Sequence, residues 1–303
     1  MTHPGGGTRT FTTDAPIDLK QTLGPLWHGR HDPTIRLRRD RLQWATRTPQ
    51  GPGTVAVQLA GRVATAAAWG PGGSWLLEQA PQLVGATDDP DGFSPQHRAV
   101  ERAWRRAPGL RIGACGVVWD VLVPTILAQK VTGLEAARSW LRLIRRFGEP
   151  APGPLGLTLA PHPDRLAGLP VWDFHRAGVE EKRARTIRTA GARYDRLQEI
   201  AGMDTVAAYK RLTAMPGIGA WTAARVLRYV NGDTDAVEVG DFHIKHLVCW
   251  NLAGEPRGDD IRMMELLEPY RGHRGRVVRL LGVGAPHAPA YGPRQATRDI
   301  RAL

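Results

Sequence analysis

The sequence predicts a mainly α-helical protein with a small antiparallel α+β domain at its N-terminus. Between positions 35 and 66, short segments tend to alternate apolar and polar residues, which is typical of strands with one wet face. From Ser94 onward, apolar residues recur at helical spacing instead. A polar segment rich in turn formers, residues 86–92, separates the two patterns. We therefore expect an N-terminal domain over 1–93, a helical domain over 94–290 and a C-terminal tail over 291–303.

Four strands and ten helices are expected within these domains. The strands lie at 35–38, 42–45, 54–59 and 63–66, with turns at 39–41 and 49–53, and a short helix opens at Trp75. Ser94 and Pro95 suit the start of the first long helix, since serine caps helices and proline is tolerated in the first turn. The long helices are expected at 94–106, 119–128, 132–147, 179–195, 204–214, 220–230, 241–251, 259–268 and 274–282. The Pro/Gly-rich stretch 149–156 is expected to be a surface loop.

The composition is that of a folded protein without membrane-spanning helices or a disulfide scaffold. The 303 residues are 42% hydrophobic and 23% charged, as in folded soluble proteins, and no apolar run approaches the roughly 18 residues of a membrane helix. The opening residues carry no secretory signal pattern, so a cytoplasmic location is expected. Two cysteines, Cys115 and Cys249, are too few for a disulfide scaffold, a four-thiolate iron–sulfur cluster or an all-cysteine zinc site. Both are expected to be buried thiols.

The basic charge lies in the later part of the chain. Residues 1–95 hold nine Lys/Arg and eight Asp/Glu, whereas residues 96–303 hold 32 and 21, and the net charge is +12. Such an excess favours a polyanionic partner, nucleic acid first. Only five of the basic residues are lysine, so coding composition is an equal explanation for the arginines.

The segment Pro216-Gly217-Ile218-Gly219 predicts a tight turn between two helices. Glycines let the backbone approach a bound group closely, and the amides at the following helix N-terminus can bind a phosphate. An ordinary helix-turn-helix corner would also use glycine. Further along, Asp241 stands at the expected start of a helix, where alone it would be an N-cap.

Taken together, these segments resemble the helix-hairpin-helix–Gly/Pro–Asp (HhH-GPD) superfamily of DNA base-excision glycosylases, nearest to its AlkA-type 3-methyladenine branch. The motif Leu-x-x-Met-Pro-Gly-Ile-Gly-x-Trp-Thr-Ala over 212–223, followed by Gly-Asp-Phe-His-Ile-Lys over 240–245, carries the resemblance. Segments 122–132 and 268–271 resemble two further family signatures, so the similarity covers about residues 94–285. It implies a two-lobed helical fold with a cleft between the lobes, and the N-terminal sheet resembles the additional domain of the AlkA-type branch.

The resemblance implies a reaction as well as a fold. Asp241 matches the family's catalytic aspartate, which stabilises a sugar with oxocarbenium character and helps to position water. Lyase members carry a lysine where this chain has Trp221, so a monofunctional glycosylase without AP-lyase activity is expected. It would flip a damaged base, expected to be an alkylated purine, out of duplex DNA and start base-excision repair. The alternatives are a glycosylase for deaminated or oxidised bases, and a non-catalytic DNA-damage-binding protein.

DNA contacts are implied at several positions. The amides of Gly217 and Gly219 would bind phosphate, and Gln129 and Lys130 match the wedge that fills the gap left by a flipped base, although that wedge is typically leucine. His243 and Lys245 could add contacts. For Lys130, His243 and Lys245, a solvated surface position is the alternative.

The base pocket is where the sequence departs from the family. Trp221 agrees with the AlkA-type branch, and could either stack on the base or pack between the hairpin helices. Two further aromatic positions are occupied by Arg225 and Arg279, which would repel a cationic alkylated base. Either the alignment slips, or the lesion is of another class, or other aromatic residues fill the role. Those candidates are Trp119, Trp172 and Phe174.

No cofactor is expected to be required, and an iron–sulfur cluster is not expected. The family's hairpin often holds a monovalent cation, Na⁺ or K⁺, through carbonyls that would here belong to Thr213, Met215 and Ile218. The expected partner is double-stranded DNA containing damaged bases, so the protein would associate with the nucleoid. A monomer is expected, with no membrane partner.

Overall fold

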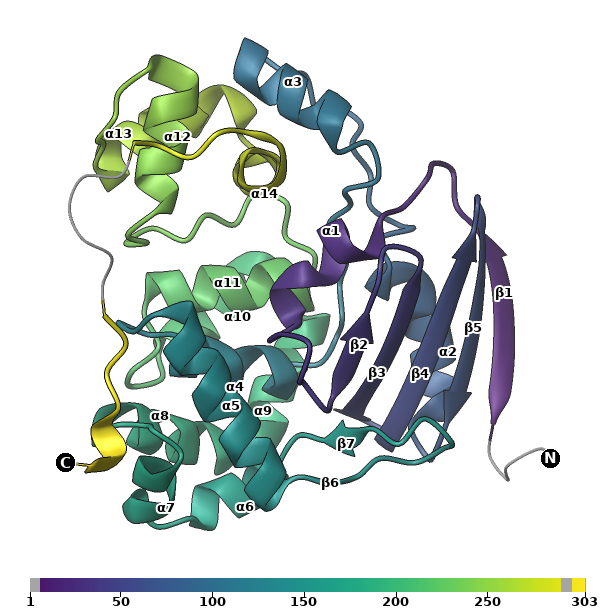
Figure 1. Ribbon diagram of the computed structural model, residues 1–303. Coiled ribbons are helices and arrows are strands. Elements are labelled where there is room, and N and C mark those ends of the chain that lie inside the picture. The colour runs from purple at the N-terminus through teal and green to yellow at the C-terminus, as the bar shows by residue number, and fades with distance from the viewer. Residues whose placement is uncertain (1–5, 290–295, 303) are drawn as a thin grey trace.

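A computed structural model describes residues 6–289 and 296–302 (Figure 1). The predicted fold class is confirmed: one antiparallel sheet lies at the N-terminal end, and helices form most of the rest. No helix in the described part of the chain is long and apolar enough to cross a membrane. Cys115 and Cys249 are buried and free, as expected. Of the expected tail, residues 291–295 and 303 lie outside the described residues.

The sheet has five strands in the order β1-β5-β4-β3-β2, all antiparallel. These are β1 (Gly7–Thr12), β2 (Ile35–Leu37), β3 (Arg41–Thr48), β4 (Gly51–Ala60) and β5 (Val63–Trp69). The four predicted strands are confirmed. The outer strand β1 was not predicted, because its side chains are almost all exposed and leave no apolar alternation to read. Helix α2 (Gly73–Leu83) follows and packs on the sheet, as Figure 1 shows.

A first lobe of helices shares one hydrophobic core with the sheet. Val57 in β4 and Leu127 and Leu143 in the helices belong to the same buried cluster. The lobe contains α4 (Trp119–Leu127), α5 (Gly133–Phe147), α6 (Pro163–Gly168), α7 (Val171–Arg176), α8 (Glu181–Gly191), α9 (Tyr194–Gln198), α10 (Thr205–Thr213) and α11 (Ala220–Val230). The stretch expected as a loop at 149–156 begins with a two-residue strand, β6 (Glu149–Pro150), which pairs with β7 (Thr158–Leu159).

A second lobe has its own core and combines helices far apart in the sequence. Helix α3 (Arg98–Arg106) packs with α12 (Ile244–Ala253), α13 (Asp260–Leu267) and α14 (Arg274–Gly284) (Figure 1). The chain therefore forms α3 in this lobe, crosses to the first lobe for α4–α11, and returns to the second lobe at α12. Two interlobe crossings result, at 107–118 and at 231–243.

Three predicted helix boundaries were wrong. Helix α3 begins at Arg98 rather than Ser94, because the preceding residues are held differently: the Gln96 amide donates to the Tyr270 hydroxyl at 3.1 Å. The helix expected at 179–195 divides into α8 and α9. Helix α12 begins at Ile244 rather than Asp241: its N-cap is His243, and the Asp241 side chain accepts the His243 and Ile244 amides from two residues before the N-cap.

A short segment between β1 and β2 reaches the junction of the two lobes. It contains α1 (Leu19–Leu23) and the 3₁₀ turn η1 (Gly24–Leu26), neither of which was predicted. Arg279 in α14 donates to the Gln21 carbonyl at 2.5 Å, which ties this segment to the second lobe. In Figure 1, α1 lies between α14 and α11.

A buried ion pair also joins the N-terminal region to the second lobe. Asp88, in the connection between α2 and α3, lies 2.6 Å from Arg276 of α14, and both side chains are almost completely buried. Asp88 also accepts the amide of Ile112, in the first interlobe crossing, at 3.0 Å.

Candidate functional site

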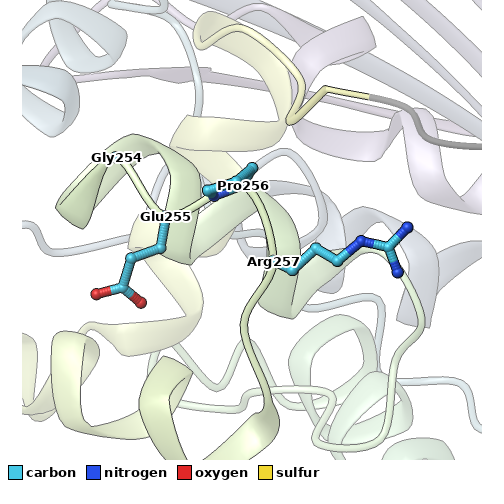
Figure 2. A pocket seen from close by; sticks show the side chains of 4 residues that line it. All are labelled: Gly254, Glu255, Pro256 and Arg257. Carbon is cyan, nitrogen blue, oxygen red and sulfur yellow. The ribbon is translucent and has the colours of Figure 1, made fainter.

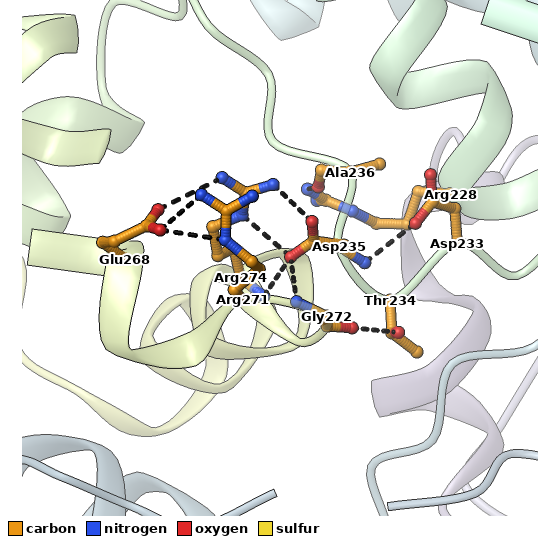
Figure 3. Close-up of polar contacts among 9 residues, drawn as sticks. All are labelled: Arg228, Asp233, Thr234, Asp235, Ala236, Glu268, Arg271, Gly272 and Arg274. Atoms are coloured by element: carbon orange, nitrogen blue, oxygen red, sulfur yellow. Dashed lines mark hydrogen bonds and ion pairs between the residues drawn. The ribbon is translucent and has the colours of Figure 1, made fainter. Parts of the chain in front are cut away.

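The second interlobe crossing is held at its start by a network of charged side chains (Figure 3). Asp235 accepts the Gly272 amide at 2.8 Å and the Nε of Arg274 at 2.8 Å. The hydrogen bonds to Arg274 hold the pKa of Asp235 below its ordinary value, although burial opposes them most strongly. Arg274 extends the network to Glu268, as Figure 3 shows. The crossing is therefore fixed to the start of α14.

A buried ion pair holds the next part of the crossing against α11. Arg228 and Glu238 lie 2.6 Å apart, and both side chains are only 2% exposed. Arg228 also donates to the Ala236 carbonyl. Burial works against the charged guanidinium, but the charge of Glu238 overcomes it and raises the pKa of Arg228. The pair fixes the backbone three residues before Asp241, whose amide donates to the Glu238 carbonyl at 3.1 Å.

The Asp241 carboxylate accepts three hydrogen bonds and is half-buried. Its Oδ1 accepts the amides of His243 and Ile244 at 2.8 and 3.0 Å, which caps α12. Its Oδ2 accepts the indole N–H of Trp221 at 2.9 Å. Asp241 is thus both a helix cap and a carboxylate held against the first turn of α11, in a single orientation.

The predicted hairpin is present between α10 and α11. Gly217 has φ +88°, and a Cβ there would lie 2.2 Å from Thr186 Oγ1, so both the backbone conformation and α8 require glycine. Gly219 stands immediately before α11, and a Cβ there would meet no atom within 4 Å. The open space at a helix N-terminus suits an anion, so phosphate binding at Gly219 stays a reasonable prediction.

Gln129 connects the loop between α4 and α5 to this hairpin. Its side-chain amide donates to the Gly217 carbonyl and to Thr222 Oγ1, both at 2.9 Å. The neighbouring Lys130 is exposed and has φ +57°. Among the described residues, no other residue except glycine has a positive φ. Such backbone strain concentrates at functional positions. The structure thus places the predicted wedge beside the hairpin, while its action on DNA stays a prediction.

The two arginines expected in the base pocket lie in different surroundings. Arg225, one turn along α11 from Trp221, has its guanidinium carbon 5.9 Å from the Trp221 ring centroid and 5.8 Å from that of Tyr229. Arg279 instead binds the Gln21 carbonyl, so it positions α1. The structure does not support the alternative aromatics: Trp119 and Phe174 are buried in the first-lobe core, and Trp172 is 65% exposed on α7.

The other predicted contact residues lie on either side of this site. His243 is exposed, and Lys245 is 3.7 Å from Asp260 in an ion pair. Between them and Asp241, Phe242 is 72% exposed, a feature that its apolar character could not predict. Of the carbonyls expected to hold a cation, that of Met215 accepts the Ile218 amide at 3.1 Å. The described residues contain no group of three His, Cys, Asp or Glu side chains that could hold a metal.

A surface hollow lies apart from these residues. It is lined by Gly254, Glu255, Pro256 and Arg257, which follow α12, and Figure 2 shows Glu255 and Arg257 pointing in different directions. Glu255 is paired with Arg262 at 2.9 Å. None of the predicted site residues lines this hollow.

Comparison with known proteins shows which sequences and solved structures this chain is similar to. No family model matches the chain. It is 31% identical over 158 residues to the probable bifunctional transcriptional activator/DNA repair enzyme AlkA of Mycobacterium tuberculosis, a match that covers 51% of this chain and 31% of that protein. The matched segment thus spans about a third of the length of that relative.

Two solved structures extend the similarity over nearly the whole chain. The 3-methyladenine DNA-glycosylase from Archaeoglobus fulgidus has a TM-score of 0.75 at 16% identity and covers 90% of this chain and 97% of its own. The Clostridium acetobutylicum 8-oxoguanine glycosylase/lyase has a TM-score of 0.70 at 14% identity. The match covers 94% of this chain and 100% of the Clostridium chain. The chain therefore has the fold of these two DNA glycosylases, and half of it is also similar in sequence to AlkA.

Proposed function

We propose that the chain is a monofunctional DNA glycosylase that flips a damaged base out of duplex DNA and hydrolyses its N-glycosidic bond, the first step of base-excision repair. The observation that carries this proposal is the fixed Asp241 carboxylate, which contacts Trp221 in the first turn after the hairpin. A damaged base in double-stranded DNA is the proposed partner. The proposed enzyme acts in the cytoplasm at the nucleoid, as a monomer, and needs no cofactor, although a monovalent cation could bind in the hairpin.

Each residue has a role in the proposed reaction. As the base departs, positive charge grows on the sugar, and the nearby Asp241 carboxylate stabilises it and orients the attacking water. The hairpin amides hold the backbone of the flipped nucleotide's strand. Lys130, at the exposed tip beside Gln129, fills the gap left in the duplex. Asp241 is the only side chain in this scheme that acts on the reacting atoms.

Replacing Trp221 with Phe is expected to lower single-turnover base release by about 10-fold. The change removes the N–H that holds Oδ2, a charge-assisted bond of about 1.5–3 kcal/mol, but keeps an aromatic ring in place. Because Oδ1 still caps α12, the melting temperature should change little. An unchanged rate would show that the indole N–H does not orient the carboxylate.

Absence of lyase activity is a second expected result. A Schiff base needs an amine near C1′, and the position used by lyase members is Trp221 here. Incubation with substrate DNA and sodium borohydride should therefore give no covalent adduct, whereas alkali should cleave the product strand at the abasic site. A trapped adduct would contradict the monofunctional assignment.

Two lesion classes remain candidates. Alkylated purines are supported by the names of the relatives, AlkA and a 3-methyladenine DNA-glycosylase. Deaminated or oxidised bases are favoured by Arg225, since this cation already lies near the Trp221 ring. Base release from a panel of lesion-bearing duplexes, with mass detection of the freed base, tests the glycosylase proposal. If no lesion is released by the unmodified protein, a non-catalytic damage-binding protein becomes the better assignment.

A further inference from the structure

Arg225 is a half-buried cation without a hydrogen-bonding partner. No hydrogen bond or ion pair to its guanidinium occurs within residues 6–289 and 296–302, and the guanidinium lies over the rings of Trp221 and Tyr229. A guanidinium presents five N–H donors in a planar fork. None of the Arg225 nitrogens is fully buried, so these donors stay open to solvent and to an acceptor on a bound group.

His28, far away in the sequence, is a second polar side chain without a hydrogen-bond partner, close enough for the charge of Arg225 to act on it. It follows η1, and within the described residues neither of its ring nitrogens has a hydrogen-bond partner. Its main chain is fixed, because Asp32 accepts the His28 amide at 3.2 Å, and its ring packs edge-on against Trp140 at 5.9 Å. The imidazole is therefore held in position without a partner of its own.

The imidazole is neutral at physiological pH. Burial and, to a smaller extent, the positive charge of Arg225 together lower the pKa of His28 to about 4. A neutral imidazole offers one donor and one acceptor nitrogen. The two side chains thus present several donors and one acceptor. Arg225 is linked to the Asp241 carboxylate through Trp221, by one ring contact and one hydrogen bond.

This arrangement is unfavourable for a cationic ligand. An aromatic ring attracts a cation through its electron-rich face, but Arg225 already supplies that charge near both rings. A second positive charge in the same half-buried space would be repelled. A neutral base with carbonyl oxygens has the opposite character, because its acceptors match the guanidinium fork.

We propose that Arg225, together with His28, selects a neutral purine that carries a carbonyl oxygen, a deaminated or oxidised base, over a cationic alkylated purine. The proposal rests on the glycosylase function proposed above and assigns its substrate class. Arg225 donates to two adjacent acceptors on the edge of the flipped base, and His28 donates or accepts at a third position. Trp221 packs on the ring of the base.

The test measures single-turnover base release from four duplexes that differ in one base: hypoxanthine, 8-oxoguanine, 7-methylguanine and undamaged guanine. We expect the unmodified protein to release hypoxanthine or 8-oxoguanine at least 10-fold faster than 7-methylguanine. Arg225→Tyr should lose at least 10-fold on the neutral lesion and gain on 7-methylguanine, which is cationic. Arg225→Lys keeps the charge but loses the fork, and should lose rate on the neutral lesion without the gain.

Matched controls separate specificity from folding. Arg41→Gln changes an exposed arginine of β3 that contacts Gln58 in the sheet, and should match the unmodified protein on every duplex. His28→Gln should lower release of the neutral lesion without improving 7-methylguanine. A faster release of 7-methylguanine by the unmodified protein, or an equal loss on all lesions in Arg225→Tyr, would overturn the substrate class. Failure to release any base would instead overturn the glycosylase function.

Discussion

Asp241→Asn is expected to lower single-turnover base release by about 10³-fold. The amide has the shape of the carboxylate but carries no negative charge, so it cannot stabilise the growing positive charge on the sugar. Its oxygen can still accept the amides of His243 and Ile244, so the cap of α12 survives. The amide nitrogen would then face the Trp221 N–H, at the cost of one hydrogen bond.

Duplex binding and folding are the readouts that make this result specific. Because phosphate contacts dominate affinity for DNA, the dissociation constant for a lesion-bearing duplex should stay within a few-fold. Asp259→Asn is the matched control: this side chain caps α13 by accepting the Arg262 amide at 2.8 Å, and asparagine caps equally well. Base release by Asp241→Asn at a rate near that of Asp259→Asn would exclude Asp241 as the catalytic group.

Glu238→Ala is expected to lower the free energy of unfolding by about 3–5 kcal/mol. The change leaves the Arg228 guanidinium buried without its counter-ion, although it keeps the Ala236 carbonyl and Tyr229 as neighbours. Chemical denaturation followed by tryptophan fluorescence measures this loss. The midpoint should move to lower denaturant without a change in slope.

The double variant Arg228→Met with Glu238→Met distinguishes the pair from its individual charges. Replacing a buried ion pair by apolar side chains is often close to neutral, so the double variant should recover most of the stability. If Glu238→Ala unfolds at the same denaturant concentration as the unmodified protein, the pair does not fix the interlobe crossing. Exposed Glu181, which pairs with Arg185 on α8, is the control, and its change to Ala should cost under about 1 kcal/mol.

The sequence predicted the elements whose signals are local. Helix α11 was placed at its observed ends, 220–230, because a glycine precedes it and its apolar residues recur regularly. Strand β1 and helix α1 were not predicted, since an exposed edge strand and a five-residue helix carry too few apolar positions to form a pattern. Boundaries failed where a contact distant in sequence decides them, as with Tyr270 and the residues before α3.

The candidate site divides in the same way. The hairpin and Asp241 were found from motifs, because short-range backbone chemistry dictates glycine and a capping carboxylate there. From the sequence, Arg225 stood out only because it occupies a position where the resembled family has an aromatic residue. Its neighbour His28 lies almost 200 positions earlier, and no spacing rule relates the two. The approach of His28 to Arg225 depends on tertiary packing.

The buried pair of Asp88 and Arg276 bears on how a duplex would reach the proposed site. Asp88 holds α14 and also the Ile112 amide, so a single carboxylate fastens two separate parts of the chain at the lobe junction. Hinge opening would have to break the two hydrogen bonds of this pair and the hydrogen bond from the Ile112 amide together, which opposes large opening motions. The DNA, rather than the protein, would then have to change shape when the complex forms. Bending a duplex costs several kcal/mol, and the cost depends on which base steps are bent. A lesion that weakens stacking would lower that cost, and so would be favoured before any of its atoms touches the protein.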